Sequence, residues 1–261
     1  MSQITTHAPG TFCWAELGTT DAEAAKRFYA GVFGWEPEST PAGEAGTYTL
    51  LKLRGREICG LSTMQKEQLA QGVPPHWLPY VAVASADDTT KKAASLGATI
   101  LASPFDVMDH GRMSVLQDPT GAAFALLQAK SHPGAGVRDE PGSISWCELL
   151  TNDAKAAGKF YSALFGWTLK DMPMPHIAYT VYSQGSTPVG GMMAIQKEWG
   201  PVPSNWLTYF AVDDCDARAE KAKRLGASIL KPPTDAPNAG RFSVLHDPQG
   251  GTFGIIQNTG A

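Results

Sequence analysis

The stretch GTFCWAELGTTDAEAAKRFYAGVFGW at residues 10–35 returns at residues 142–167 as GSISWCELLTNDAKAAGKFYSALFGW, with 14 of 26 positions identical. A second stretch, GRMSVLQDPTGAAFALLQ at 111–128, matches GRFSVLHDPQGGTFGIIQ at 240–257 at ten of 18 positions. The repeat covers each half of the chain but occurs only twice, too few times for a solenoid. It predicts two tandem homologous domains at residues 8–130 and 142–261, joined by the polar, Gly- and Pro-rich linker 131–141.

Local patterns predict the same order of strands and helices in each half. Asp21 is placed to cap a helix that ends at Gly34, and a second helix is predicted over 87–96. Period-two alternation and turn residues predict the strands of the first half at 11–18, within 36–46, at 47–54, 57–64 and 80–84, from 99, and in a hairpin over 111–128. The sequence therefore predicts an α+β fold of four βαβββ modules, two in each half.

The composition limits the kinds of partner that the protein can have. The chain has 261 residues, a net charge of −4 and no basic run, so it lacks the charge pattern of a nucleic-acid-binding protein. Its longest apolar runs are strand-sized, and its first ten residues lack the features of a secretory signal. Cys13, Cys59, Cys147 and Cys215 form no C-x-x-C pair, which favours free thiols. We expect a cytoplasmic protein that binds neither nucleic acid nor membranes.

The combination of these motifs resembles a known family over both halves. A strand, an Asp-capped helix with F-Y-x-x-x-F-G-W, and then G-R-x-S-V-L-x-D-P-x-G are similar to the vicinal oxygen chelate superfamily of glyoxalases, bleomycin-resistance proteins and extradiol dioxygenases. The doubled arrangement most resembles the tandem two-domain branch that includes a mycobacterial 27 kDa culture-filtrate antigen. The resemblance implies two glyoxalase-like domains whose mixed sheets curl around a cup. In active members, His and Glu side chains hold a divalent metal in this cup, where it polarises oxygens of the substrate.

The metal ligands of the family are not found at the matching positions of this chain. Those positions carry no side chain that can donate oxygen or nitrogen to a cation, and they are occupied by Trp14 and Trp146, Leu78 and Leu207, and Ala125 and Gly254. The six histidines do not pair across the repeat either. We therefore predict no metal and no other cofactor. A divalent metal held by displaced ligands is the alternative, and no spacing supports it.

Two carboxylates lie close in sequence to the tryptophans at the first of these positions. Strand alternation places Glu16 on the cup face with Trp14, and Glu148 with Trp146. A carboxyl beside an indole in a partly dry pocket would have a raised pKa, which suits a general acid or base or a group that binds a ligand. Both glutamates are thus candidate catalytic residues, with no catalytic residue assigned. The alternative is that each glutamate accepts hydrogen bonds from backbone or tyrosine donors and only fixes the turn before the helix.

Other candidate ligand-binding residues lie in the segments that begin the second module of each half, and in a loop near the second cup. Tyr80 and Tyr209 are expected on the cup face, and aromatic walls with few polar groups suit a small organic ligand. His76 stands where the other half has Asn205, so it is either a ligand contact or a hydrogen-bonded loop residue. His176 lies in the Pro- and Met-rich segment 171–179, which is predicted to be a loop that covers the second cup.

Further charged residues of the motifs have mainly structural interpretations. Asp118 and Asp247 each precede a proline at the head of a turn, which is sufficient reason for an Asp there. Arg112 and Arg241 are expected to pair with carboxylates and hold the hairpin, with an anionic substrate as the alternative.

Three classes of function remain open. The first is a metal-free protein that binds a small organic molecule in one or both cups. The second is a metal-dependent lyase or dioxygenase of the glyoxalase type with non-standard ligands, so enzymatic activity is left undecided. The third is a structural or partner-binding protein with vestigial cups. Both a monomer and a homodimer are compatible with the repeat, because two joined copies can mimic the dimer of single-domain members.

Overall fold

The computed structural model describes residues 3–259 except 42, 44, 45, 175, 176 and 238. The first half follows the predicted order, with the addition of a short helix before its second module. Its elements are β1 (Phe12–Thr19), α1 (Ala22–Phe33), β2 (Glu36–Pro41), β3 (Thr47–Leu53), β4 (Arg56–Thr63), α2 (Lys66–Ala70), β5 (His76–Ala82), α3 (Ala86–Ser95), β6 (Thr99–Val107), β7 (Gly111–Gln117) and β8 (Ala123–Ala129). The fold class predicted from the sequence, α+β with four βαβββ modules, is confirmed.

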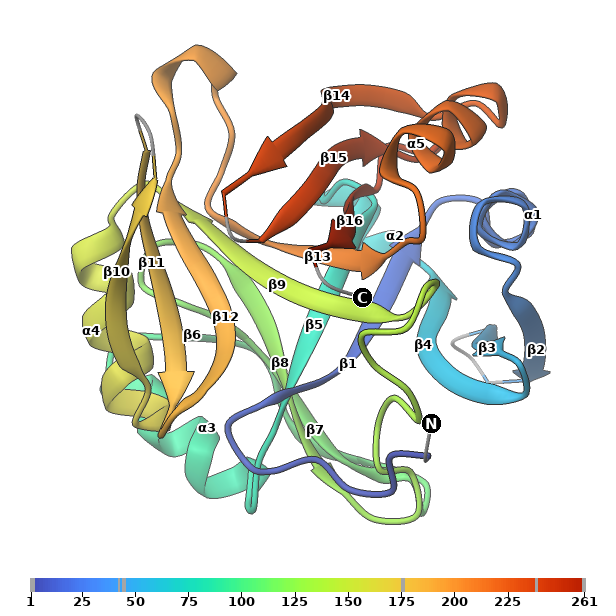
Figure 1. Cartoon of the computed structure of the whole chain (residues 1–261). Coiled ribbons are helices and arrows are strands. Elements are labelled where there is room, and N and C mark those ends of the chain that lie inside the picture. Colours follow the sequence, from blue (N-terminus) through green and yellow to red (C-terminus); the bar gives the residue numbers. More distant parts are fainter. Residues whose placement is uncertain (1–2, 42, 44–45, 175–176, 238, 260–261) are drawn as a thin grey trace.

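The second half repeats this order (Figure 1). Its elements are β9 (Ile144–Thr151), α4 (Ala154–Phe165), β10 (Thr168–Met174), β11 (Ile177–Gln184), β12 (Thr187–Ala194), the 3₁₀ turn η2 (Lys197–Trp199), β13 (Asn205–Ala211), α5 (Cys215–Arg224), β14 (Ser228–Ala236), β15 (Gly240–His246) and β16 (Thr252–Asn258). No helix of the described residues is long and apolar enough to cross a membrane.

Helices α1 and α4 begin and end for local reasons. Asp21 accepts a hydrogen bond from the backbone N–H of Ala24 at 2.9 Å, which satisfies one of the free donors of the first turn. Gly34 takes the left-handed conformation, with φ of 77°, that ends the helix without a steric penalty. Asp153 and Gly166 do the same for α4. These helix ends are the features that the sequence predicted.

Each half forms an open, curled mixed sheet. The strand order is β2-β3-β4-β1-β5-β8-β7-β6 in the first half and β10-β11-β12-β9-β13-β16-β15-β14 in the second. The modules begin with β1 and β5 in the first half and with β9 and β13 in the second. In each half these two strands pair with each other in an antiparallel arrangement, and each of them pairs in parallel with the last strand of its own module. One parallel pairing, between His76 of β5 and Thr252 of β16, joins the two sheets.

The segment 171–179 is not the covering loop that the sequence predicted. Most of it forms the β10–β11 hairpin, in which Tyr179 pairs with Met172. Pro173 is tolerated because β10 lies at the edge of the sheet, where a missing N–H costs no ladder hydrogen bond. The prolines were therefore a poor signal for a loop. His176 lies outside the described residues.

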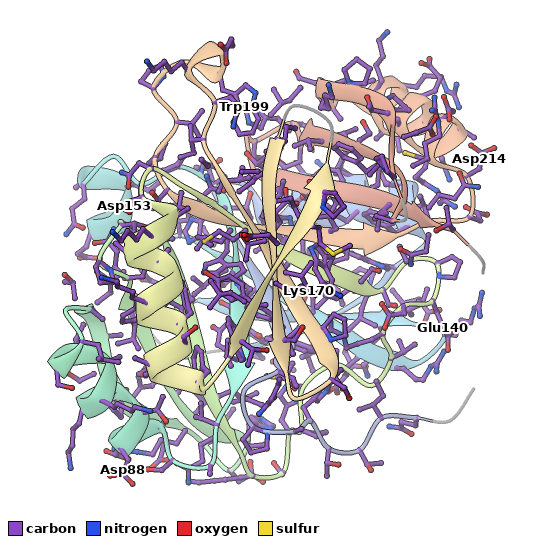
Figure 2. The ribbon with its side chains drawn as sticks, turned by 60° about the vertical axis from the view of Figure 1, so that its left-hand side comes forward. Asp88, Glu140, Asp153, Lys170, Trp199 and Asp214 are labelled. Atoms are coloured by element: carbon purple, nitrogen blue, oxygen red, sulfur yellow. The ribbon has the colours of Figure 1, made fainter. Side chains whose placement is uncertain are left out.

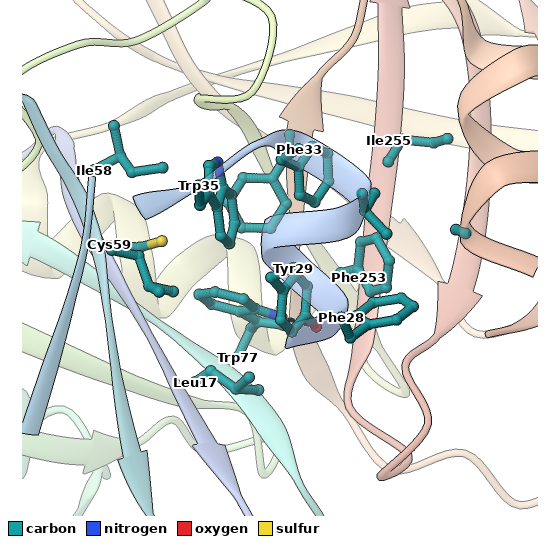
Figure 3. Packing of buried hydrophobic residues seen from close by; sticks show 14 of the residues in the cluster. Leu17, Phe28, Tyr29, Phe33, Trp35, Ile58, Cys59, Trp77, Phe253 and Ile255 are labelled. Atoms are coloured by element: carbon teal, nitrogen blue, oxygen red, sulfur yellow. Dashed lines mark hydrogen bonds between the residues drawn. The ribbon is translucent and has the colours of Figure 1, made fainter. Parts of the chain in front are cut away.

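The hydrophobic cores are shared between the halves. One core packs α1 of the first half against β13, β16 and α5 of the second, so that Phe28, Phe33 and Tyr29 meet Phe253 (Figure 3). A second core joins α4 to strands of the first half, and Figure 2 shows α4 beside α3. Neither half therefore buries its motif helix against its own strands alone.

Two hydrogen-bond relays connect the motifs across these cores. The hydroxyl of Tyr29 accepts from Trp77 Nε1 and donates to Asp247 Oδ2 of the other half, both at 2.9 Å. In the second half, the hydroxyl of Tyr161 accepts from Trp206 Nε1 at 2.8 Å and donates to Asp118 Oδ2 at 2.9 Å. The Tyr of each F-Y-x-x-x-F-G-W motif thus bonds to the D-P-x-G turn of the opposite half.

The tryptophan that ends each motif makes a similar contact. Trp35 Nε1 donates to the carbonyl oxygen of Gly142 at 2.7 Å, and Trp167 Nε1 donates to that of Gly10 at 2.8 Å. Each tryptophan thereby fixes the start of the first strand of the other half. These contacts orient β1 and β9, which carry Glu16 and Glu148.

Candidate functional site

In the first cup, the carboxylate of Glu16 is held by three hydroxyl groups. Oε1 accepts from Ser62 Oγ at 3.0 Å, and Oε2 accepts from the hydroxyls of Tyr48 and Tyr80, each at 3.2 Å. These side chains come from β4, β3 and β5, the strands around β1. Burial raises the pKa of Glu16, and the three hydrogen bonds oppose this shift only in part.

The strand register explains why these residues meet. Glu16 pairs with Gly60 on one side and with Leu78 on the other, and Trp14 pairs with Tyr80. A Cβ atom at Gly60 would lie 2.0 Å from the hydroxyl oxygen of Tyr48. Glycine is therefore required at this position if the Tyr48 hydroxyl is to reach Glu16.

The second cup repeats the arrangement around Glu148. Oε1 accepts from the hydroxyl of Tyr209 at 3.1 Å, and Trp146 Nε1 donates to the hydroxyl of Tyr179 at 2.9 Å. Burial raises the pKa of Glu148, opposed by hydrogen bonds from Tyr179 and Tyr209. A Cβ atom at Gly191 would lie 1.9 Å from the Tyr179 hydroxyl, so this glycine has the same role as Gly60.

The two carboxyls differ in the number of donors that hold them. Ser62 pairs with Tyr48 in the first cup, and the residue that pairs with Tyr179 in the second is Met193. A methionine side chain has no hydrogen-bond donor. The second glutamate therefore lacks the counterpart of the serine bond and keeps more acceptor capacity for another group.

The cups also differ in how they are covered. In the first, the ring of His132 meets the ring of Trp14 edge to face, with centroids 4.6 Å apart, and Ala135 packs in the same apolar cluster. Trp14 is consequently only 3% exposed, whereas Trp146 is half-buried. The linker, which we expected to be polar, is largely buried from Gly134 to Val137. The linker therefore covers Trp14, whereas its counterpart Trp146 is left more exposed.

Most of the residues selected from the sequence lie in these two clusters. Glu16 lies with Trp14 and Tyr80, and Glu148 lies in one network with Trp146 and Tyr209, in addition to Tyr179. The sequence reasoning missed Tyr48 and Tyr179. The signal was a repeated Tyr-Thr pair at residues 48–49 and 179–180, hidden because an insertion changes the spacing of the repeat by one residue.

His76 has a local partner outside the clusters. Its Nδ1 donates to the carbonyl oxygen of Pro74 at 2.8 Å, and in the other half Asn205 Nδ2 donates to that of Pro203 at the same distance. The two side chains thus perform the same turn-closing role, which accounts for His76 without a ligand. Asp118 and Asp247 cap their turns as expected, and Arg112 pairs with Asp87.

The side chains in these two cups do not provide the donor set of a metal site. The described residues contain no group of three or more His, Cys, Asp or Glu side chains placed to hold a metal. The positions of the family ligands are lined by indole, aliphatic side chains and glycine, and the carboxylate oxygens face hydroxyl donors. Such a cluster is suited to a hydrogen-bonding ligand, and a metal-free state remains a prediction.

Comparison with known proteins gives matches over both halves. The family model described as the Glyoxalase/Bleomycin resistance protein/Dioxygenase superfamily matches residues 143–255, and a model described as a Glyoxalase-like domain matches residues 14–127. "Putative glyoxylase CFP32" of Mycobacterium tuberculosis is 39% identical over 98% of each chain. "Anthracycline biosynthesis protein DnrV" of Streptomyces peucetius is 35% identical over 97% of this chain and 95% of its own.

Solved structures show the same fold at low sequence identity. A Mn(II)-bound glyoxalase from Novosphingobium aromaticivorans superposes with a TM-score of 0.66 at 19% identity, covering 95% of this chain and 82% of its own. The 2,3-dioxygenase LapB from Pseudomonas sp. KL28 has a TM-score of 0.64 at 14% identity, covering 99% and 93%. At these identities the likeness is one of fold.

Proposed function

Because this chain belongs to the Glyoxalase/Bleomycin resistance protein/Dioxygenase superfamily, we propose that it binds a small organic molecule in its second cup without the family's metal. The observation that carries the proposal is the difference between the two glutamates. Glu16 is held by three hydroxyls, whereas Glu148 lacks the serine donor and lies beside Trp146, which is more exposed than Trp14. The free acceptor capacity of Glu148 would then bind a donor group of the ligand.

The chemistry of the second cup favours a flat ligand that carries a hydroxyl group. Trp146, Tyr179 and Tyr209 supply aromatic surface, and a carboxyl beside them exchanges hydrogen bonds with a phenol or an enol. The relative named for anthracycline biosynthesis supports an aromatic ligand of this kind. The raised pKa of Glu148 also lets it hold a proton at a higher pH than an ordinary carboxyl, so a proton transfer to the bound ligand is the reaction that this site could support.

The proposal can be tested by titrating the full chain with an anthracycline and following the fluorescence of the ligand. Glu148→Gln should weaken binding at least about tenfold, since a hydrogen bond to a charged group contributes about 1.5–3 kcal/mol. The matched variant Glu16→Gln should leave the affinity unchanged. Equal losses in the two variants, or no binding by the wild type in a wider panel of hydroxylated aromatic compounds, would overturn the proposal.

The metal-free part of the proposal needs a separate measurement. Protein purified without chelator should contain less than stoichiometric Mn, Fe, Ni or Zn by elemental analysis. Addition of Mn²⁺ or EDTA should not change the affinity for the anthracycline. A stoichiometric metal whose removal abolishes binding would instead support the metal-dependent alternative.

A further inference from the structure

The linker occupies a specific groove in the first half of the molecule. It runs between β1 and β4, where the N–H of Ala135 donates to the carbonyl oxygen of Cys13 and the N–H of Gly136 donates to the backbone carbonyl oxygen of Glu57, both at 2.7 Å. The fit is close, because a Cβ atom at Gly134 would lie 2.6 Å from the Cys13 oxygen. Only glycine fits at this position of the groove.

The corresponding groove of the second half lies between β9 and β12. The repeat places Ser145 where the first half has Cys13, and Pro188 where it has Glu57. Both residues line a cavity of about 440 Å³, bounded also by the N-terminal segment around His7 and by Arg138 and Asp139 at the end of the linker. This volume is within the range of about 300–1,000 Å³ that is common for small-molecule sites.

The cavity contains the positive charge of Arg138. The guanidinium of Arg138 donates to the carbonyl oxygens of Phe12 and Ser145, which fixes its position across the two halves. In the described part of the chain, no carboxylate oxygen lies within 4.0 Å of it. Arg138 keeps further N–H donors in a planar fork that matches a carboxylate. His7 adds no charge at neutral pH, because burial lowers its pKa.

The remaining lining defines the shape and charge of a ligand. The Trp146 ring is fixed by its bond to Tyr179 and lines the cavity, giving aromatic surface near Arg138. Asp139 lies exposed at the rim, where its Oδ1 accepts from Ser145 Oγ at 3.1 Å. A negative rim disfavours highly charged anions, so the lining suits a single carboxylate attached to a flat ring.

We propose that this junction cavity, between the N-terminal segment, the linker and β9, is a second ligand site that binds an aromatic monocarboxylate. The carboxylate pairs with Arg138 and the ring packs against Trp146. Glu148 does not line the cavity. The site shares Trp146 with the second cup but not its glutamate, so it goes beyond the proposed function of the cup.

A titration of the full chain with 2-naphthoate, followed by ligand fluorescence, tests this site. Arg138→Gln should weaken binding at least about tenfold, as expected for the loss of a charge-assisted pair. Uncharged 2-naphthamide should bind wild type more weakly by a similar factor. Arg241→Gln, which makes the same charge change on an exposed pair that does not line the cavity, should change the affinity by less than about twofold.

A second variant keeps the test independent of the structural bonds of Arg138. Asp139→Asn removes the negative rim charge, and Asn tolerates the positive φ of 61° at this position. It should tighten 2-naphthoate binding about two- to threefold, as expected for removing one screened like charge. Weaker or unchanged binding by this variant, or equal binding of naphthoate and naphthamide, would overturn the proposal. Glu148→Gln should leave naphthoate binding unchanged, which separates this site from the cup.

Discussion

Replacing Tyr29 by Phe should destabilise the whole molecule, because its hydroxyl is one of the buried groups that connect the two halves. The Tyr29 side chain is fully buried, and its hydroxyl both accepts from Trp77 and donates to Asp247. Without the oxygen, the Trp77 N–H loses its acceptor and Asp247 Oδ2 loses its donor, while Asp247 Oδ1 keeps the backbone N–H groups of Gln249 and Gly251. The two losses are coupled and should cost about 3 kcal/mol in total, given about 1–3 kcal/mol for each unsatisfied buried group.

The expected loss of stability has a pH dependence that identifies its cause. Burial raises the pKa of Asp247, and the Tyr29 hydrogen bond opposes this rise. A carboxyl with a raised folded-state pKa stabilises the fold most when it is protonated, and this contribution is lost as the pH rises through the folded pKa. Tyr29→Phe raises that pKa further. The variant should therefore lose more stability at pH 7 than at pH 4.

Guanidinium denaturation followed by tryptophan fluorescence, with calorimetry alongside, measures both effects. About 3 kcal/mol corresponds to a Tm decrease of about 6–12 °C for a chain of this size. Tyr161→Phe should give a similar loss through Trp206 and Asp118, and the double variant should be additive because the two relays lie in different cores. A loss below about 1 kcal/mol at pH 7 would refute the relay, and separate unfolding of the two halves would refute the shared cores.

Three further predictions concern the second cup. Glu148→Gln should raise the Tm at pH 8 but not at pH 4, because burial disfavours only the ionised carboxyl, and calorimetry at both pH values measures this. Gly191→Ala should displace the Tyr179 hydroxyl, whose oxygen would lie 1.9 Å from the new Cβ, and should weaken binding of the cup ligand about tenfold in the anthracycline titration. Met193→Ser should supply the donor that Ser62 supplies in the first cup, which lowers the pKa of Glu148 in an NMR titration and weakens ligand binding; an unchanged pKa would contradict the assigned equivalence.

The sequence predicted those parts of the fold that depend on neighbouring residues. Alternation located β1, and the cap at Asp21 and the glycine at Gly34 located α1, because each signal acts within a few residues. It missed the short helix α2, which has no buried residue and therefore no apolar stripe. The same reasoning failed for 171–179, where prolines at a sheet edge were taken as a loop.

The site could be predicted only in part, for a similar reason. Alternation placed Glu16 beside Trp14. Tyr48, however, reaches Glu16 from β3, a strand distant in sequence from Glu16, and the register of β3 is set by its pairing with β4. Asp118 makes one contact that the sequence predicted and one that it did not. Its Oδ1 caps the turn, as the D-P-x-G motif predicted, whereas its Oδ2 accepts from Tyr161 in the other half. No spacing in the sequence specifies that second partner.

The repeat separates the residues that hold the halves together from those that differ between the cups. The identical residues of the motifs include the Tyr and Asp of the relays, and both relays join the halves rather than line a cup. Two of the cup positions differ, with serine replaced by methionine at 193 and the alanine that pairs with Tyr80 replaced by Gly254. A residue kept identical for assembly gives no information on ligands, whereas a difference between two copies of one scaffold does. The opened groove and the less constrained glutamate both lie in the second half, so ligand binding is to be sought there.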